Sequence, residues 1–361
     1  MRKERSDWGP AAGVREALAG ALSPALRVAY RATHAGLAIG CGGAMRMAYL
    51  AIDRRALKPY PARTWKVLAE RFDRLLERDW KNAERGYYPR ELLFSGPPGT
   101  LAKIPEGLLE VGRVARRKQK NRFQDLPKEI DHDRFPSYYL RNFHWQTDGW
   151  FSERSARMYD FEVEVLFGGT ADIMRRMAIP PLVDAVCSLD APRILDVACG
   201  TGRYLSQLSR AIPRARLFGL DLSPHYIKEA QRNLAQVPEL SLVVDNAEHM
   251  PFADESFDAV SSVFLFHELP RSARRAVASE IARVLRPGGV LSLCDSAQLV
   301  DSPELEPAFE TFAAVYHEPY YLDYVRQDLA PTLEAAGLEI TSVEPHSVSK
   351  VVVARKKLSS R

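Results

Sequence analysis

The pattern of apolar and polar positions changes its character about halfway along the chain. From residue 178 onward, short apolar runs alternate with amphipathic stretches that follow the 3.6-residue period of a helix. The runs have the length and composition of buried parallel strands, and they cover residues 193–197, 215–220, 240–244, 257–264 and 289–295. This alternation predicts an α/β fold in which helices cover both faces of a parallel sheet.

The C-terminal segment predicts a different strand pairing. A helix over 325–336, with Gly337 as its C-cap, precedes two more strands at 338–344 and 348–355. Only residues 345–347 join these strands, which is too short for a crossover, so they must pair as an antiparallel hairpin. We therefore expect a Rossmann-like, doubly wound, seven-stranded sheet with five parallel strands and a C-terminal antiparallel hairpin.

The N-terminal part of the chain follows helical patterns instead. Residues 11–57 are rich in Ala and Leu, and residues 62–85 predict an amphipathic helix. The longest stretch of 11–57 without Lys, Arg, Asp or Glu is 32–45, which is too short for a transmembrane helix. Residues 11–57 are either a buried helix pair or an amphipathic anchor in the plane of a membrane. We expect three units: a helical N-terminal domain (1–135), an aromatic lid or linker (136–177) and the α/β domain (178–361).

Charge is distributed unevenly between the two parts. Residues 1–150 contain 28 Lys and Arg against 17 Asp and Glu, whereas residues 151–361 contain 22 against 29. The densest basic cluster lies in 113–122, which is either a solvated helix face or a site for an anionic membrane surface or an anionic substrate carrier. Interleaved aromatic residues and RNA-binding motifs are missing, so we expect no nucleic-acid partner.

The cysteines favour a reducing compartment. The chain has four, Cys41, Cys187, Cys199 and Cys294, in apolar or motif contexts and without C-x-x-C spacing. We expect free, buried thiols, no zinc, and a cytoplasmic protein with at most a peripheral membrane contact.

The first strand of the α/β part ends in a turn of small residues. The segment from Ile194 to Leu205 reads ILDVACGTGRYL and passes from an apolar run directly into a helical pattern. Such a unit brings backbone N–H groups and a helix N-terminus close to a ligand. Gly200 and Gly202 remove the Cβ atoms that would keep a ligand from the main chain. No Gly-Lys-Ser/Thr follows and position 205 is Leu, so the unit is neither a P-loop nor a dinucleotide fingerprint.

Three further motifs follow in order. Asp221 ends the second apolar run, twenty-five residues after Asp196. The other two are VDNAEHMPF with SFDAV, at residues 244–252 and 256–260, and VLRPGGVL at 284–291. Together with the small-residue turn, these motifs resemble those of the class I S-adenosylmethionine (SAM) methyltransferases. The resemblance covers about residues 155–356 and is nearest to the methyltransferase type 11/25 group, in the branch of the ubiquinone and menaquinone C-methyltransferases.

This resemblance implies a binding site for SAM and its product S-adenosylhomocysteine (SAH). Ala198 departs from the first Gly of the family motif, and Asn246 stands where the family usually has Asp to receive the adenine amino group. The small-residue turn would hold the methionine half of SAM, and Asp221 would bind the ribose. The implied cofactor-binding residues are Asp196, Ala198, Gly200, Gly202, Asp221, Leu222, Asn246, Ala247 and Tyr159.

The resemblance also implies methyl transfer to a small, largely apolar acceptor, aromatic or lipid-like, by C- or O-methylation. The sulfonium methyl is already electrophilic, so we expect the transfer to be metal-independent. The candidate general bases are His267, oriented by Glu268, then His144 and Asp295; His267 could instead be a wall residue. Two other functions stay open: a non-catalytic SAM-binding regulatory or scaffold protein, and a SAM-site enzyme for decarboxylation or cyclisation.

An aromatic segment at 138–150 precedes the α/β part. Its density of aromatic residues would be costly on an exposed surface. In similar methyltransferases this segment forms a lid over the cofactor, often through a Tyr-Asp pair that here is Tyr159-Asp160. The segment is either that lid or an aromatic hinge that packs the N-terminal part onto the α/β part. The implied substrate-binding residues are Trp145, Gln146, Trp150, Phe264 and Glu268.

Overall fold

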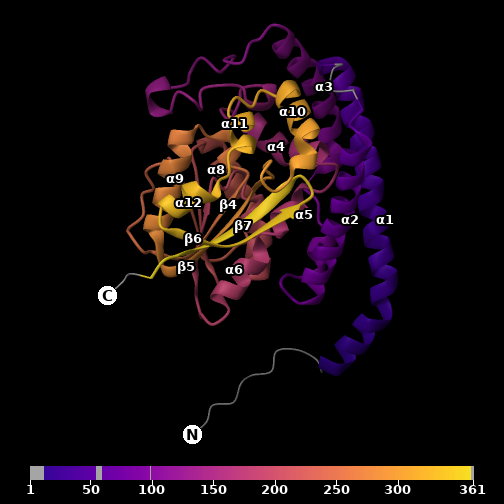
Figure 1. Cartoon of the computed structure of the whole chain (residues 1–361), viewed down its shortest axis with the longest axis vertical. Helices are drawn as coiled ribbons and strands as arrows, with labels where there is room; N and C mark the ends of the chain where they lie inside the picture. The colour runs from indigo at the N-terminus through magenta and orange to yellow at the C-terminus, as the bar shows by residue number, and fades with distance from the viewer. Residues whose placement is uncertain (1–11, 54–58, 98, 359–361) are drawn as a thin grey trace.

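The computed structural model describes residues 12–53, 59–97 and 99–358, with side chains from residue 24 (Figure 1). Within these residues, one seven-stranded sheet has the order β3-β2-β1-β4-β5-β7-β6. Its strands are β1 (Arg193–Val197), β2 (Arg216–Asp221), β3 (Leu240–Val244), β4 (Phe257–Val263), β5 (Leu285–Ser296), β6 (Leu338–His346) and β7 (Ser349–Lys356). The first five pair in parallel, and β7 pairs antiparallel with β5 and β6. The predicted fold class is confirmed.

The sheet has a hydrophobic core on each face because successive residues of a strand point to opposite sides. In β1, Ile194 belongs to one core, whereas Leu195 and Val197 belong to the other. The first core includes α5 (Ala171–Arg176), α6 (Ile179–Val186), α7 (Arg203–Ala211) and α8 (Pro224–Asn233). The second includes α9 (Arg271–Val284), α10 (Glu306–Val315), α11 (Tyr321–Arg326) and α12 (Ala330–Ala335).

The N-terminal part contains three long helices. They are α1 (Ala12–Ile52), α2 (Ala62–Glu84) and α3 (Thr100–Gln119), and α4 (Glu153–Leu166) follows the aromatic segment. Figure 1 shows α1 and α2 side by side along one side of the molecule. The expected helix pair within 11–57 is wrong for the described residues, since α1 is one helix and most of its side chains from residue 24 are not buried. No turn-forming Asn, Asp or Pro lies between Pro24 and Ile52, and the Ala and Leu residues there favour helix despite four glycines.

One helix of the N-terminal part meets the length and composition criteria for a membrane span. The segment Pro24–Ile52 is long enough to cross a membrane, and an 18-residue window within it has a mean hydropathy of 1.4. A few charged residues are compatible with such a span, so the short uncharged stretch 32–45 does not exclude it. Core helices of soluble proteins and signal sequences satisfy the same criterion.

The N-terminal helices and the sheet share one hydrophobic core. Trp80 of α2 and Tyr30 of α1 belong to the same buried cluster as Ile194 of β1. At the centre of the contact, the buried carboxylate of Asp79 accepts hydrogen bonds from Tyr30, Tyr88 and the Arg176 guanidinium of α5, at 2.6–2.8 Å. The division of the chain at 135 and 177 stays a prediction, but the parts on either side are packed together.

The helix expected over 325–336 is interrupted. The structure has α11 up to Arg326 and a new helix, α12, from Ala330. Pro331 explains the break, because proline lacks the N–H for a helical hydrogen bond and its ring clashes with the carbonyl four residues earlier. Gly337 follows α12 with a φ of +90°, as expected of a C-terminal glycine.

Candidate active site

The main cavity lies at the C-terminal ends of β1, β2 and β4, where doubly wound sheets bind their ligands. It encloses about 1040 Å³ of space, part of it open to solvent. The turn after β1, the ends of β2 and β4 and the aromatic segment all contribute to its lining. Of the nine expected cofactor residues, Gly202 is outside the lining and the others are within it: Asp196, Ala198, Gly200, Asp221, Leu222, Asn246, Ala247 and Tyr159.

The small-residue turn is held in left-handed backbone conformations. Ala198, Gly200 and Gly202 have φ values of +59°, +55° and +76°. A Cβ on Gly202 would lie 2.5 Å from a methyl group of Leu234, so this glycine permits close packing at the start of α7. Gly202 therefore contributes to the shape of the turn without lining the cavity. Ala198 carries a Cβ where the family usually has glycine, which makes its left-handed conformation an uncommon one.

Asp221 sits at the end of β2 and is already bonded to the main chain. The Gly200 N–H donates to Oδ2 and the Ser223 N–H donates to Oδ1, both at 2.9 Å. Burial raises the pKa of Asp221 to about 6, although these two bonds favour its ionised form. Each carboxylate oxygen keeps acceptor capacity, which is what a pair of ribose hydroxyls requires.

Two charged residues that the sequence reasoning did not assign also line the cavity, Asp160 and Arg175. Asp160 Oδ2 accepts a hydrogen bond from the Thr201 hydroxyl at 2.8 Å, but its buried Oδ1 has no such partner among the described residues. Arg175 on α5 is buried and pairs with Asp172 at 2.9 Å. In the sequence, the Tyr159-Asp160 pair could have indicated Asp160, because similar methyltransferases have such a pair in the lid segment. No sequence motif indicated Arg175.

The loop after β3 contributes Asn246 and Ala247 to the cavity lining. The Asn246 Oδ1 accepts a hydrogen bond from the Glu248 N–H at 2.9 Å and keeps a second lone pair. The Tyr138 hydroxyl donates to Glu248 Oε1 at 2.7 Å. The aromatic segment is therefore tied to the loop that we expected to bind adenine.

The aromatic segment forms one wall of the cavity. Trp150 contacts Tyr159 and Tyr226 edge to face, with ring centroids 5.6 and 5.5 Å apart, and all three line the cavity. Phe264 and Glu268, at the end of β4, line it as well. The segment thus lines the cavity and also bonds to Arg117 of α3 in the N-terminal part. Its role as a lid stays a prediction.

Two expected substrate-binding residues lie outside this lining. The Trp145 indole N–H donates to the Val315 carbonyl at 3.1 Å, and the Gln146 side-chain amide donates to the Ser155 hydroxyl at 2.8 Å. Both residues are buried within the protein. The reason is a turn, η4 (Phe143–Trp145), in which His144 and Trp145 have positive φ values of 54° and 59°. Sequence spacing alone does not reveal this reversal of direction.

His267 also lies outside the cavity lining, and its partner differs from the one expected. Its Nδ1 is 2.6 Å from Oδ1 of Asp295, so Asp295 orients the ring and Glu268 does not. Burial lowers the pKa of His267, but the charge and hydrogen bond of Asp295 outweigh this and raise it to about 9. A protonated imidazole cannot accept a proton, so this arrangement does not favour His267 as a general base at neutral pH.

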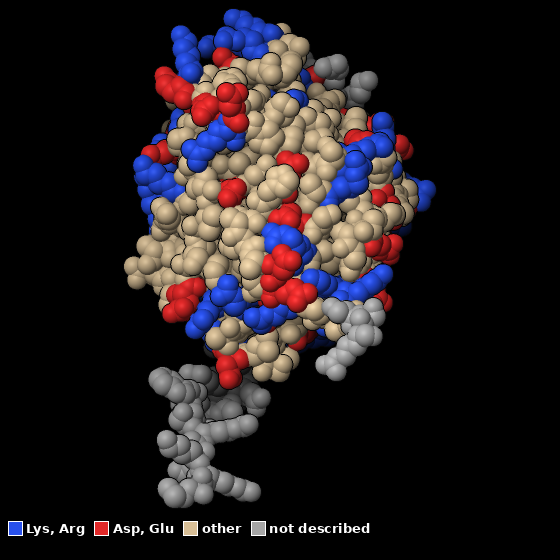
Figure 2. All heavy atoms as spheres, turned by 90° about the vertical axis from the view of Figure 1, so that its left-hand side faces the viewer, with Lys and Arg blue, Asp and Glu red and all other residues tan. Residues whose placement is uncertain are grey.

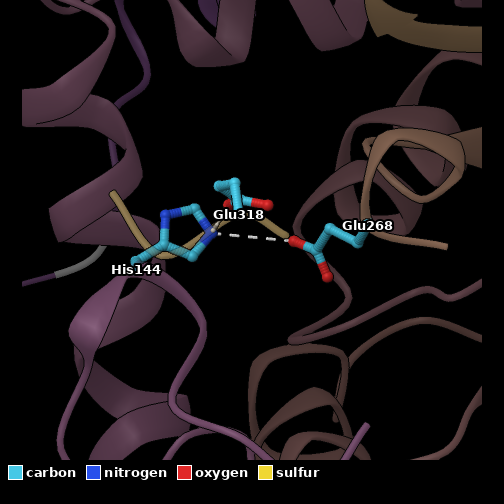
Figure 3. A group of neighbouring side chains, drawn as sticks. All are labelled: His144, Glu268 and Glu318. Carbon is cyan, nitrogen blue, oxygen red and sulfur yellow. Dashed lines mark ion pairs between the residues drawn. The ribbon is translucent and has the colours of Figure 1, made fainter. Parts of the chain in front are cut away.

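Glu268 contacts the other expected base instead. The His144 Nε2 lies 3.6 Å from Glu268 Oε1 and 2.8 Å from Glu318 Oε1 (Figure 3). Burial again lowers the pKa of His144, but the neighbouring carboxylates of Glu318 and Glu268 outweigh this and raise it to about 10. We expected no metal site because the sequence contains no clustered ligands. The structure brings together three ligand-type residues that are far apart in the chain, and Glu318 was not foreseen.

Part of the amino-acid sequence around this cavity matches a known protein family. Residues 194–289 match the model of the methyltransferase domain family. This segment belongs to the class I SAM-dependent methyltransferases. The match includes the small-residue turn, Asp221 and Asn246, so the family assignment rests on the same residues that form one side of the cavity.

Curated relatives of the methyltransferase domain act on different molecules, according to their names. The chain is 44% identical over 108 residues to phthiotriol/phenolphthiotriol dimycocerosates methyltransferase of Mycobacterium leprae, covering 30% of this chain and 39% of the relative. It is 37% identical over 124 residues to fatty-acid O-methyltransferase of Mycolicibacterium smegmatis, covering 34% and 44%. It is 28% identical over 199 residues to demethylmenaquinone methyltransferase of Lysinibacillus sphaericus, covering 50% and 80%. The chain thus spans less than half of the first two relatives.

The cofactor of this family is SAM, and the cavity lining has residues that fit it, from the matched segment and from α4 and α5 before it. The unpartnered Asp160 Oδ1 and the buried Arg175 offer opposite charges beside the glycine turn, as the ammonium and carboxylate of an amino acid require. Asp221 also lines the cavity and offers acceptors for two hydroxyls. The donor and acceptor set therefore agrees with the cofactor that the family implies.

Proposed function

We propose that this protein transfers a methyl group from SAM to a small, largely apolar acceptor. The observation that supports the proposal most is one cavity whose lining contains two kinds of residue. Polar and charged residues of the methyltransferase motifs line it together with aromatic residues from 138–160. Methyl transfer requires both, because SAM is polar and charged whereas an apolar acceptor gains affinity from buried apolar contact.

The proposed roles follow from these positions. Asp160 and Arg175 bind the ammonium and carboxylate of SAM, Asp221 binds its ribose hydroxyls, and Asn246 accepts a hydrogen bond from its adenine amino group. Bound SAM supplies an electrophilic methyl carbon. The aromatic wall around Trp150 aligns the acceptor with that carbon and excludes water.

The acceptor we propose is a lipid-like or quinol-like molecule. The names of the relatives include a fatty acid, a dimycocerosate lipid and demethylmenaquinone, which are apolar molecules of different chemistry. An acceptor oxygen that is already ionised at neutral pH, such as a fatty-acid carboxylate, needs no general base. This agrees with a site whose two histidines have raised pKa values and lie outside the cavity lining.

A labelled-methyl transfer assay tests the proposal. The protein is incubated with [methyl-³H]SAM and, in turn, a long-chain fatty acid, a long-chain alcohol and a demethylated quinol. We expect label in the organic phase with one of these acceptors, an equal amount of SAH, and less transfer by Asp221→Ala at a SAM concentration that does not saturate it. SAM consumption without SAH formation would instead support decarboxylation or cyclisation at the same site.

We also propose that the N-terminal helices dock the protein peripherally on a membrane on the cytoplasmic side. Large apolar side chains are exposed on α1 and α3, which pack against each other: Leu26, Val28, Leu37, Ile39, Met47, Leu50, Leu101, Ile104, Leu108 and Leu109. Arg113 and Arg116 of α3, and Lys120 directly after it, are exposed and suit anionic headgroups. Arg117 and Lys118 of the same basic cluster are not available, because they bond to Trp145 and to the carbonyls of Ala314 and Val315.

The side of the molecule away from α1 differs from this apolar face. Figure 2 shows this side, where acidic and basic side chains are interspersed.

Vesicle sedimentation tests the docking surface. We expect the protein to sediment with vesicles that contain anionic lipid, and the variant Leu108→Glu/Leu109→Glu to bind them less. Val300→Glu is the matched control, because Val300 is exposed on the α/β part. Equal sedimentation of all variants would contradict the docking surface, and a dimer lost only in the double variant would assign it to a second copy.

A further inference from the structure

We propose that His144, Glu268 and Glu318 bind a divalent first-row transition-metal cation. The three residues come from separate parts of the chain. His144 lies in the turn η4, Glu268 ends the short helix η5 (Phe266–Glu268) after β4, and Glu318 lies between α10 and α11. Figure 3 shows the three side chains pointing toward one another.

The distances between the ligand atoms suit one cation. One nitrogen and two carboxylate oxygens lie within 4.8 Å of one another. With metal–ligand bonds of about 2.0–2.2 Å, neighbouring ligand atoms lie roughly 3 Å apart and opposite ones about 4.4 Å apart. The His144 Nε2 lies 2.8 Å from Glu318 Oε1 and 3.6 Å from Glu268 Oε1, so small side-chain movements are enough.

The triad is buried and its polar atoms are incompletely bonded. The Glu318 side chain has 0% of its surface exposed, and the side chains of His144 and Glu268 have 19% and 16%. Among the described residues, neither carboxylate oxygen of Glu318 nor Nε2 of His144 has a hydrogen bond of good geometry. A buried carboxylate without hydrogen bonds is costly, and two carboxylates exceed the charge of one imidazolium. A divalent cation bound by neutral His144 would balance both charges.

The backbone around His144 holds the triad together. His144 has a φ of +54°, which is uncommon for a residue with a side chain. Its N–H donates to the His317 carbonyl at 3.3 Å, so the turn that carries His144 is joined to the residue before Glu318. Strained backbone of this kind is retained where the surrounding structure fixes it, often at functional sites.

The donor set selects the class of cation. An imidazole with two carboxylates suits Mn²⁺, Fe²⁺ or Zn²⁺ better than Mg²⁺ or Ca²⁺, which prefer oxygen ligands alone. Glu268 also lines the main cavity, and the His144 ring lies 5.8 Å from the ring of Trp150. If the proposed function is correct, the cation stands on the acceptor side and binds an acceptor oxygen; the methyl group of SAM needs no activation by a metal.

Metal binding to the whole chain tests this inference. The purified protein is stripped with a chelator and titrated with Mn²⁺, Zn²⁺ and, without oxygen, Fe²⁺. We expect one high-affinity site per chain for at least one of these cations and at least about tenfold weaker binding by Glu318→Gln. The control is Glu344→Gln, since Glu344 lies 3.7 Å from Nε2 of His346 but belongs to no group of three ligand-type residues within the part of the chain that the structure describes, and its metal affinity should equal that of the wild type.

Thermal unfolding and SAH binding separate this inference from folding defects and from the proposed function. The bound cation should raise the melting temperature of the wild type and of Glu344→Gln but not of Glu318→Gln. Glu318→Gln should still bind SAH, which shows that the cavity is intact. If the wild type binds none of the three cations, or Glu318→Gln binds them as tightly, the metal site is wrong even if SAH binds. If the wild type does not bind SAH, the proposed function is wrong, and this result does not contradict the metal site.

Discussion

Replacing Asp79 with Ala tests whether the N-terminal helices are an integral part of the fold. Asp79 lies on α2 with 0% of its surface exposed. Its carboxylate binds Arg176 of α5, which is 1% exposed, and accepts the hydroxyl groups of Tyr30 and Tyr88. One side chain thus connects α1, α2, the segment after α2 and the helix that carries Arg175 into the cavity lining.

The expected destabilisation can be estimated from these contacts. Asp79→Ala leaves the Arg176 guanidinium buried without its counter-ion, and removal of one partner of a buried ion pair costs about 3–5 kcal/mol. The hydroxyls of Tyr30 and Tyr88 lose a charged acceptor, which adds about 1 kcal/mol or more. We therefore expect the free energy of unfolding to fall by about 4–6 kcal/mol, against a total of about 5–15 kcal/mol for a typical domain.

Urea unfolding of matched variants measures this effect. Asp73→Ala is the control on the same helix, because the Asp73 side chain is 62% exposed and pairs with Arg31 at the surface. Its cost should be below about 1 kcal/mol. Adding Arg176→Met to Asp79→Ala should recover much of the lost stability, since no unpaired charge remains. If Asp79→Ala costs no more than Asp73→Ala, the network does not hold the helices to the sheet and our reasoning is refuted.

Three further predictions concern the cavity. Asp221→Ala should weaken SAH binding at least about tenfold in calorimetry, because hydrogen bonds to a charged group contribute about 1.5–3 kcal/mol; an unchanged affinity would remove Asp221 from the ribose site. Burial raises the pKa of Asp221 to about 6, and the ionised carboxylate is the better hydrogen-bond acceptor. The SAH affinity of the wild type should therefore be retained above pH 6 and fall as the pH drops through this value, with a smaller fall in Asp221→Asn. A pH-independent affinity of the wild type would contradict this. Trp150→Ala should raise the KM for the acceptor or lower kcat, with little change in SAH affinity. Trp145→Ala should mainly lower thermal stability. Equal kinetic effects of the two substitutions would mean that the acceptor does not lie against Trp150.

The strands and the cofactor side of the cavity could be predicted from the sequence because their signals are local. A parallel strand covered on both faces is a short apolar run, and the runs at β1 to β4 appear as such. Residues that follow parallel strands meet at one edge of the sheet, so Asp196, Asp221 and Asn246 could be placed together without a structure. The break between α11 and α12 also has a local signal, because Pro331 stands within the predicted helix 325–336.

The features that escaped prediction depend on tertiary contacts. The direction of Trp145 is set by the positive φ values of His144 and Trp145, which the packing against Val315 and His317 stabilises. The triad joins three separate segments, because His144 lies 124 residues before Glu268 and Glu318 lies 50 residues after it. The pairing of His267 with Asp295 likewise depends on the neighbouring positions of β4 and β5.

The shared core determines what a truncation of the N-terminal part would do. The structure places Leu75, Leu76 and Trp80 of α2 in the same core as Ile194, and their removal would expose that core. A protein that begins near Ser152 should therefore be unstable, so point substitutions are the better test of the lid.

Calorimetric titration of the whole chain with SAH tests the central claim most directly. The claim is that the cavity formed by the turn after β1, Asp221 and Asn246 is a SAM site. The predicted result is one binding site per chain, with an affinity within the range of about 1 μM to 1 mM that is usual for enzyme substrates, and with weaker binding by Asp221→Ala. No detectable binding by the folded wild-type protein up to about 1 mM SAH would contradict the claim.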